Sequence, residues 1–315
     1  MSLRVGVIGA GGMGREHLTN LSAIDGVEIA VVADVSADAA AVAAATVGAE
    51  VSTDPLQVAA QSDLDALVIA SPDDTHANLA LLALAAGTPT LCEKPLASTV
   101  ADAERVVAAE TAAGGPLVQV GFMRQYDPAH LQVRDTVAGL GAIHHIRSAH
   151  RNTNHDWQRP LDVVLTQSLI HDVHTARWMS GAEFVSVVIQ VVRSTERIEH
   201  VVVLGEMNNG STVTMEFVEA TYGYDIDLEV SAGGGVVNIA QPPQPVIRRD
   251  GAAHRHIGED WFGRFRTAYR LEVQNWVDGV LAGEVNGPTT GDGLAAQRVV
   301  AASLRSAETG RREMV

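Results

Sequence analysis

The sequence of 315 residues is short of cysteine and of basic side chains, and each shortage excludes a class of protein. Its single cysteine, Cys92, cannot form an internal disulfide, as is typical of proteins in a reducing compartment. It has 22 Lys and Arg against 38 Asp and Glu, which gives a formal net charge of −16. Because that charge repels phosphate backbones and anionic lipid surfaces, we expect no nucleic-acid partner and no membrane partner.

Long apolar runs are missing as well. Charges or glycines interrupt every apolar stretch before it reaches the ~20 residues that cross a bilayer. The N-terminus runs straight into a strand-like segment, without the basic and apolar regions of a secretory signal. We therefore expect a cytoplasmic protein.

The first third of the chain alternates strand-like and helix-like segments. Short β-branched apolar runs alternate with alanine-rich or helically spaced stretches in this order: 3–9, 13–24, 27–34, 36–47, 64–71 and 75–87. This alternation predicts parallel strands joined by crossover helices. A further helix at 98–113 and a strand at 117–122 end the pattern, so we place the first domain at 1–120.

The remainder, 121–315, has longer runs in which apolar and polar residues alternate, at 185–193, 200–207, 211–218 and 224–231. Alternation of this kind predicts an open, mostly antiparallel sheet. Helices are expected at 161–180 and 259–282, with apolar stripes that cover one face of that sheet. The fold class is therefore an α/β domain with a parallel sheet, followed by an α+β domain.

A glycine-rich turn follows the first strand. In GAGGMG (9–14), Gly9, Gly11 and Gly14 have the spacing that lets a dinucleotide pyrophosphate approach a helix N-terminus. Twenty residues after Gly14, the second strand ends at Asp34, whose carboxylate can accept hydrogen bonds from a ribose. Residues 35–37 include no arginine or lysine for a 2′-phosphate. The pattern predicts a Rossmann domain that binds NAD rather than NADP.

Seven short motifs together resemble the Gfo/Idh/MocA oxidoreductases, and among them most closely the inositol 2-dehydrogenases. They occur in the family's order, from residue 9 to 269: GAGGMG (9–14), SPDDTH (71–76), EKP (93–95), GFMRQYDP (121–128), HDVH (171–174), YGYD (222–225) and WFGRFRTAY (261–269). The likeness covers most of the chain. It implies an NAD-dependent dehydrogenase that oxidises a secondary hydroxyl of a cyclic polyol or sugar, and a homodimer or homotetramer.

The resemblance also implies roles for particular residues. Lys94 and His171 would manage the hydroxyl proton, with His171 as base. Inositol dehydrogenases usually carry an aspartate four residues before that histidine, whereas this chain has Gln167, which can orient the ring but cannot offset its positive charge. The catalytic prediction is thus Lys94, His171 and Gln167.

Cofactor and substrate contacts are carried over in the same way. The predicted cofactor-binding residues are Gly9, Gly11, Gly12, Met13, Gly14, Asp34, Ser71, His76, Glu93 and Lys94. The predicted substrate-binding residues are Met123, Arg124, Asn152, His155, His171, Tyr222 and Tyr224. Arginine and tyrosine can donate hydrogen bonds to a ring of hydroxyls, which discrimination among polyols requires.

Other interpretations stay open from the sequence. His171 and His174 could be core or cleft histidines, and no zinc-ligand spacing accompanies them, so no metal is expected. Gln167 is also compatible with a regulatory or catalytically weakened NAD-binding homologue. An enzyme that uses NAD transiently on a sugar could share Lys94 and His171, and a reductase of small imines or of biliverdin is a weaker alternative.

Overall fold

The chain forms two compact units in the computed structural model, which describes residues 2–153, 159–194, 197–220, 223–239, 246–255 and 260–315. The first unit comprises Met1–Met123 and Tyr269–Gln297, and the second comprises Arg124–Ala268 and Arg298–Val315. Residues 269–297 belong to the first unit, which a single domain boundary near residue 120 does not account for. In the described parts of the chain, no helix has both the length and the apolar character needed to cross a bilayer.

A six-stranded parallel sheet forms the centre of the first unit. Its strands lie in the order β3-β2-β1-β4-β5-β6, with these bounds: β1 Leu3–Ile8, β2 Val27–Ala33, β3 Glu50–Ser52, β4 Ala66–Ile69, β5 Thr90–Glu93 and β6 Val118–Gly121. Apolar β-branched residues dominate β1, β2 and β4 because both faces are covered by helices. The strand order reverses beside β1, where ligands bind in open α/β sheets.

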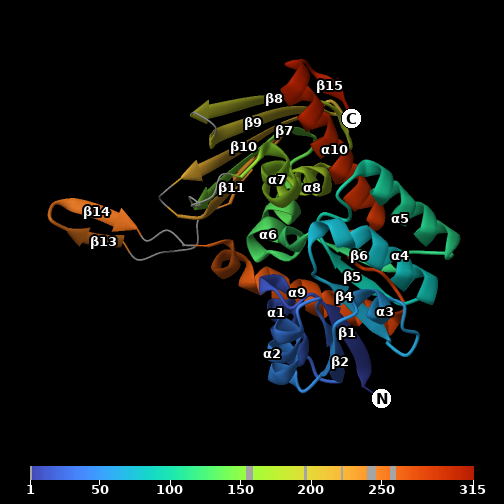
Figure 1. Ribbon diagram of the computed structural model, residues 1–315. Helices are drawn as coiled ribbons and strands as arrows, with labels where there is room; N and C mark the ends of the chain where they lie inside the picture. The colour runs from blue at the N-terminus through green and yellow to red at the C-terminus, as the bar shows by residue number, and fades with distance from the viewer. Residues whose placement is uncertain (1, 154–158, 195–196, 221–222, 240–245, 256–259) are drawn as a thin grey trace. The chain divides into compact units, whose positions relative to one another are not determined.

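Helices cover both faces of this sheet, as Figure 1 shows. The helices are α1 Gly12–Ser22, α2 Ala37–Val47, α3 Pro55–Ala59, α4 His76–Ala86 and α5 Val100–Ala112, and a 3-10 turn spans Asp73–Thr75. Local signals set their ends: Ser36 Oγ accepts from the N–H of Ala39 at the start of α2, and Gly48, with φ +72°, ends it. The predicted parallel α/β domain is confirmed.

The long helix α9, Trp261–Ala282, contributes to both units, since the division falls at residue 269. Its second half packs into the core of the first unit, where Val273, Trp276 and Val277 meet apolar residues of α1 and α2. The expectation that this whole helix covers the antiparallel sheet is therefore wrong. An amphipathic pattern shows that a helix has a buried face, but it does not identify the surface that covers it.

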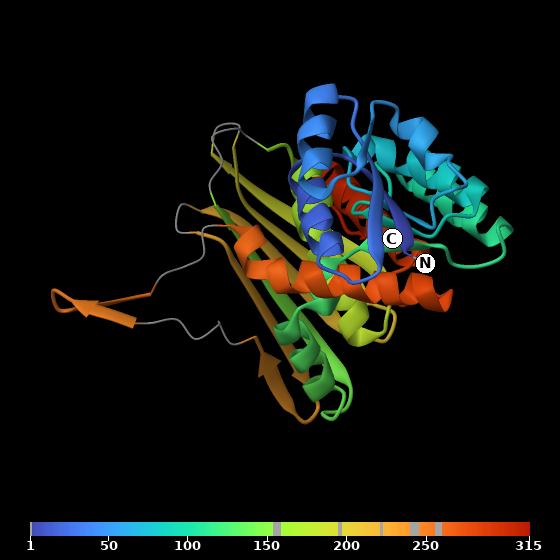
Figure 2. The same ribbon diagram turned by 90° about the horizontal axis from the view of Figure 1, so that it is seen from below.

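The second unit has a seven-stranded sheet whose long strands lie side by side in Figure 2. The order is β12-β11-β7-β10-β9-β8-β15, and only the β7–β10 pair is parallel. The bounds are β7 Ile143–Thr153, β8 Phe184–Ser194, β9 Arg197–Met207, β10 Thr212–Ala220, β11 Asp225–Ala232, β12 Gly235–Asn238 and β15 Glu313–Met314. The predicted mostly antiparallel sheet is confirmed. A separate hairpin pairs β13 Val246–Arg249 with β14 Ala252–Arg255.

The helix predicted at 161–180 is interrupted. It consists of α7 Leu161–Val164, a π-helical turn Leu165–Leu169 and α8 Ile170–Ser180. A π-helical turn inserted in an α-helix is uncommon and occurs often at functional sites. The remaining elements are a 3-10 turn Met123–Tyr126, α6 Pro128–Val137 and α10 Thr290–Thr309, which spans both units.

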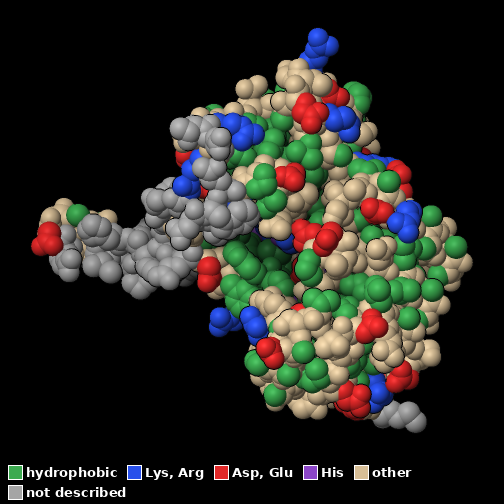
Figure 3. All heavy atoms as spheres, viewed as in Figure 1, with side chains coloured by type: hydrophobic (Ala, Val, Ile, Leu, Met, Phe, Trp, Pro, Cys, Tyr) green, Lys and Arg blue, Asp and Glu red, His purple; other side chains and the backbone are tan. Residues whose placement is uncertain are grey.

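Charged side chains are interspersed on the face shown in Figure 3. Among the described residues on this face, neither sign forms a continuous patch. The excess of acidic groups is thus dispersed there, not concentrated at one surface.

Candidate functional site

The glycine turn of the first unit combines packing constraints with an open approach. Gly9 has φ +102°, and a Cβ there would collide with the carbonyl oxygen of Ala70. A Cβ on Gly14 would overlap the carbonyl oxygen of Gly9, so α1 can pack this closely only with glycine. At Gly11 and Gly12, by contrast, an added Cβ would meet no described atom within 4 Å. The exposed turn thus presents the first N–H groups of α1 to a ligand, as pyrophosphate binding requires.

Asp34 is fixed beside this turn by two backbone hydrogen bonds. The N–H of Ala10 donates to Asp34 Oδ2 at 2.8 Å, and the N–H of Ser36 donates to Oδ1 at 2.9 Å. Each oxygen retains a lone pair that can accept from a ribose hydroxyl. The next side chain, Val35, is 82% exposed and carries no charge. The arrangement fits an adenosine ribose with a free 2′-hydroxyl, as in NAD.

The turn after β4 is tied to the turn after β5 by His76, which is buried. Its Nδ1 lies 2.7 Å from the carbonyl oxygen of Pro95, and its Nε2 lies 2.9 Å from that of Ser71. A neutral imidazole can donate to only one of these oxygens. His76 therefore joins two segments predicted to contact the cofactor, while its own contact with NAD stays a prediction.

Glu93 connects α1 to the peptide that carries Lys94. Its Oε1 lies 2.8 Å from His17 Nε2, and its Oε2 accepts from the backbone N–H of Lys94 at 3.3 Å. Gly121 leaves room for this carboxylate, since a Cβ there would lie 3.0 Å from Glu93 Oε2. Burial raises the pKa of the Glu93 carboxyl, but the hydrogen bond with His17 and nearby positive charges more than offset this, and the pKa falls below its ordinary value.

The predicted cofactor residues therefore lie at the carboxyl ends of four neighbouring strands, β2, β1, β4 and β5, or in the first turn of the helix that follows. Met13 is half-buried in the first turn of α1, between Gly12 and Gly14. This is the edge at which open parallel sheets bind nucleotides. The first unit thus has the open turn, the acid and the strand-end lysine that an NAD site needs.

The second unit contains a buried ionic network around Arg124. Arg124 Nη1 donates to Asp172 Oδ1 at 2.7 Å, and Nη2 lies 3.1 Å from His150 Nδ1. His150 Nδ1 also lies 3.2 Å from Asp172 Oδ2, and Tyr224 shares a hydrogen bond with Arg124. Burial raises the pKa of Asp172, yet Arg124 and His150 hold it well below its ordinary range. Burial lowers the pKa of the His150 ring, although the hydrogen bond with Asp172 acts in the opposite direction.

Two predicted substrate residues belong to this network. Arg124 is 1% exposed and Tyr224 is 5% exposed, and the network already engages both. Met123, the last residue of the first unit's leading segment, and Asn152, on β7, are buried too. Direct substrate contact by these four side chains stays a prediction. His155 and Tyr222 lie outside the described residues.

His171 and Gln167 lie on either side of the junction between the π-helical turn and α8. His171 is buried and Gln167 is exposed. Asp172, the next residue after His171, directs its carboxylate to Arg124 and His150, so it does not take the role of the aspartate that Gln167 replaces. Lys94 belongs to the first unit and His171 to the second.

No role was predicted from the sequence for His17, Glu272 or the group Asp127, His130 and Arg264, although Asp127 and Arg264 lie in the motifs at 121–128 and 261–269. Asp127 Oδ2 lies 2.6 Å from His130 Nδ1, and Arg264 donates to both oxygens of Asp127. The i,i+3 spacing of Asp127 and His130 at the start of α6 was the available clue. Within the described ranges, no three His, Cys, Asp or Glu side chains come together as a set of metal ligands.

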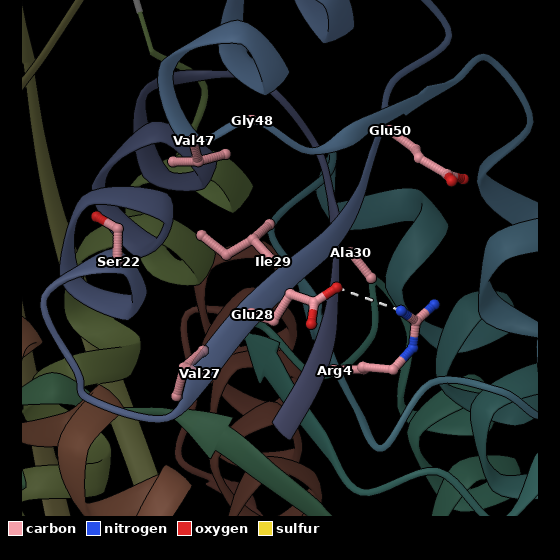
Figure 4. Close-up of a pocket in the computed structure, with 9 residues that line it drawn as sticks. All are labelled: Arg4, Ser22, Val27, Glu28, Ile29, Ala30, Val47, Gly48 and Glu50. Carbon is pink, nitrogen blue, oxygen red and sulfur yellow. Dashed lines mark hydrogen bonds and ion pairs between the residues drawn. The ribbon is translucent and has the colours of Figure 1, made fainter. Parts of the chain in front are cut away.

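A separate hollow lies at the opposite edge of the parallel sheet (Figure 4). It is formed near the amino ends of β1, β2 and β3, where Arg4 Nη1 donates to Glu28 Oε1 at 3.3 Å. The glycine turn and Asp34 follow the carboxyl ends of the strands. This hollow is therefore not the predicted nucleotide site.

The strand order, the glycine turn and Asp34 define a dinucleotide-binding domain of the Rossmann type. Comparison with known families gives the particular group. Residues 3–122 match the model of the oxidoreductase family Gfo/Idh/MocA, NAD-binding Rossmann fold, and residues 138–315 match the family's C-terminal alpha/beta domain. The chain belongs to this family, and the predicted membership is confirmed.

Two similar proteins with assigned names are inositol 2-dehydrogenases. Inositol 2-dehydrogenase 2 of Saccharopolyspora erythraea is 39% identical over 98% of this chain and 94% of its own length. An inositol 2-dehydrogenase of Klebsiella pneumoniae is 38% identical over 98% of this chain and 95% of its own. The predicted likeness to this group is confirmed.

Solved structures agree with the sequence relatives. The crystal structure of myo-inositol dehydrogenase from Lactobacillus casei in complex with NAD(H) and myo-inositol has a TM-score of 0.95 and 29% identity, covering 100% of this chain and 97% of that one. A myo-inositol dehydrogenase from Corynebacterium glutamicum has a TM-score of 0.90 and 27% identity, covering 100% and 99%.

Proposed function

We propose that this protein is an NAD-dependent dehydrogenase that oxidises a secondary hydroxyl of a cyclic polyol, with an inositol as the expected substrate class. The observation that carries the proposal is the edge of the parallel sheet, where an open glycine turn, Asp34 and Lys94 lie at the ends of neighbouring strands, in a chain 39% identical to an inositol 2-dehydrogenase. NAD, when bound there, supplies the hydride acceptor.

The residues of the chain would bind the cofactor and move the proton. Gly11 and Gly12 leave space for the pyrophosphate, and Asp34 would bind the adenosine ribose. Lys94 and His171 would take the hydroxyl proton, with His171 as base and Lys94 polarising the oxygen. Lys94 is held for this task by the hydrogen bond from its N–H to Glu93.

Gln167 supports a second candidate function. An amide at this position can orient His171 but cannot stabilise its protonated form, which suits a weakened or regulatory NAD-binding homologue or a protein that uses NAD transiently on a sugar. These candidates differ in one observable: only a simple dehydrogenase accumulates NADH in net amounts.

Domain roles, location and assembly complete the proposal. Residues 1–120 would form the NAD-binding domain, and 121–315 the substrate-binding and oligomerisation domain. The single cysteine is compatible with the cytoplasm, and Cys92 is fully buried. A homodimer or homotetramer would cover exposed apolar side chains of the second sheet, such as Val192 at 56% and Leu204 at 48% exposure.

A substrate screen tests the proposed function. Wild-type protein, Lys94→Ala and His171→Ala are mixed with NAD and with myo-inositol, scyllo-inositol or common aldoses, and NADH is followed by absorbance. We expect NADH with an inositol and a loss of about 10²–10⁴-fold in either variant, the usual contribution of a positioned acid or base. Wild-type rates in both variants would refute the proton path.

A further inference from the structure

Glu272 on α9 is a buried acid that the proposed chemistry does not use. It is 0% exposed, and neither of its carboxyl oxygens has a hydrogen-bond partner among the described residues. Burial, and then the charge of Glu93, raise the pKa of Glu272 well above its ordinary value. A buried polar group without a partner costs stability, so its retention needs an explanation.

Glu272, Glu93 and Gln119 belong to one face of the parallel sheet. In the β5–β6 register, Leu91 pairs with Gln119 and Glu93 pairs with Gly121, so the side chains of Leu91, Glu93 and Gln119 lie on the same face. Leu91 packs in the core formed with α1 and with the residues of α9 that directly follow Glu272. This shared face brings the three polar groups together beneath the two helices.

Further polar atoms on this face also lack partners. Both side-chain polar atoms of Gln119, which is 0% exposed, and Nδ1 of His17 make no hydrogen bond to any described group. With the two oxygens of Glu272, five such atoms belong to residues that neighbour Glu93: His17 by its hydrogen bond, Glu272 by its electrostatic interaction and Gln119 by its place on the same sheet face. Buried water commonly satisfies clusters of this kind, since one molecule can make two to four hydrogen bonds.

We propose that Glu272 is a positioning residue for Lys94. As an un-ionised acid, Glu272 keeps its proton and donates a hydrogen bond, through water enclosed with Gln119 and His17, to the Glu93 carboxylate, whose Oε2 accepts from the Lys94 N–H. The chain thereby fixes the strand end that presents the Lys94 side chain. This inference rests on the proposed role of Lys94 in the reaction.

The groups that face this cluster set its response to pH. Glu93 is the last residue of β5 and is followed by Lys94, His17 lies on α1, and His76 begins α4. Ionisation of Glu272 would place a second negative charge beside Glu93 and weaken the support of the Lys94 peptide. A neutral donor at position 272 avoids that repulsion.

Two substitutions separate positioning from packing. Glu272→Gln keeps a neutral donor, and Glu272→Met fills the site with an apolar group. Asp278→Asn is the control, because it makes the same replacement of a carboxyl by an amide at an exposed position on the same helix. We measure kcat, KM for NAD and for the best polyol, and the melting temperature from acidic to alkaline pH on the full-length protein.

The expected results follow from the proton of Glu272. Glu272→Gln should keep kcat within about threefold of wild type, whereas Glu272→Met should lower kcat about tenfold with little change in KM for NAD, although it stays folded. An acid whose folded pKa is raised loses stability as the pH rises above its unfolded pKa. The melting temperature of Glu272→Gln should therefore exceed that of wild type by a margin that grows with pH, and Asp278→Asn should show no such margin.

Two results would overturn the inference. One is a wild-type kcat in a folded Glu272→Met protein, and the other is a difference in melting temperature between Glu272→Gln and wild type that does not change with pH. Failure of the proposed function has a different signature. If Lys94→Ala retained activity, the role of Lys94 would be wrong, while the pH-dependent margin in melting temperature would still report the proton of Glu272.

Discussion

Replacing Asp172 by asparagine tests the buried network around Arg124. Asp172 and Arg124 have side-chain exposures of 0% and 2%, and their Oδ1 and Nη1 atoms lie 2.7 Å apart. The variant keeps the shape of the side chain but leaves the guanidinium without its counter-charge. Removing one partner of a buried ion pair costs about 3–5 kcal/mol, which for a domain of this size lowers the melting temperature by roughly 6–20 °C.

The pH dependence of this loss gives an independent check. Because the folded pKa of Asp172 is lowered, its contribution is complete above its unfolded pKa of about 3.9 and is lost as the pH falls toward the folded value. Urea unfolding is followed by circular dichroism from neutral pH down to the most acidic pH at which the fold persists. The difference in the free energy of unfolding between wild type and Asp172→Asn should narrow below about pH 4. The control is Asp102→Asn, in an exposed pair with Arg105, and should change stability little. If Asp172→Asn lowered the free energy of unfolding by less than about 1 kcal/mol at neutral pH, a structural role for the network would be refuted.

Further predictions concern the nucleotide turn, the histidine helix and the cysteine. Gly14→Ala should abolish NAD binding in calorimetry because its Cβ would overlap the carbonyl oxygen of Gly9, whereas Gly12→Ala should keep the fold and weaken NAD binding about tenfold or more, because its Cβ would enter the space proposed for the pyrophosphate. Asp34→Ala should weaken NAD about tenfold or more and reduce the preference over NADP; tighter binding of NADP by wild type would contradict this. Gln167→Asp should raise kcat on the best polyol, and an unchanged rate would remove Gln167 from the site. Cys92, whose thiol pKa is raised by burial, should resist alkylation until urea unfolds the protein, and rapid labelling of native protein would contradict its burial.

The nucleotide-binding half of the fold could be predicted because its signals are local. Gly9, Gly14 and Asp34 are fixed by contacts within one turn and the neighbouring strand end, so their spacing along the chain carries the geometry. The strands of the second sheet were predictable for a similar reason, since alternation shows directly which residues face a core.

The rest depends on contacts between distant segments. The packing of Val273 and Trp276 in the first unit's core is not encoded in the pattern of α9, which shows only that one face is buried. The π-helical turn at Leu165–Leu169 changes the hydrogen bonding without a distinct sequence signal. From the sequence alone, Glu272 would be expected on the solvated face of its helix. Its burial depends on the core that packs around it.

Transfer of deuterium from substrate to cofactor tests the proposed dehydrogenase reaction most directly. Inositol labelled with deuterium at every ring carbon is incubated with NAD and the protein, and the products are analysed by mass spectrometry. We predict NADH that carries one deuterium, formed in equal amount with a ketone, and loss of both products in Lys94→Ala and His171→Ala. Consumption of the labelled polyol without deuterium in the nicotinamide would contradict hydride transfer to NAD.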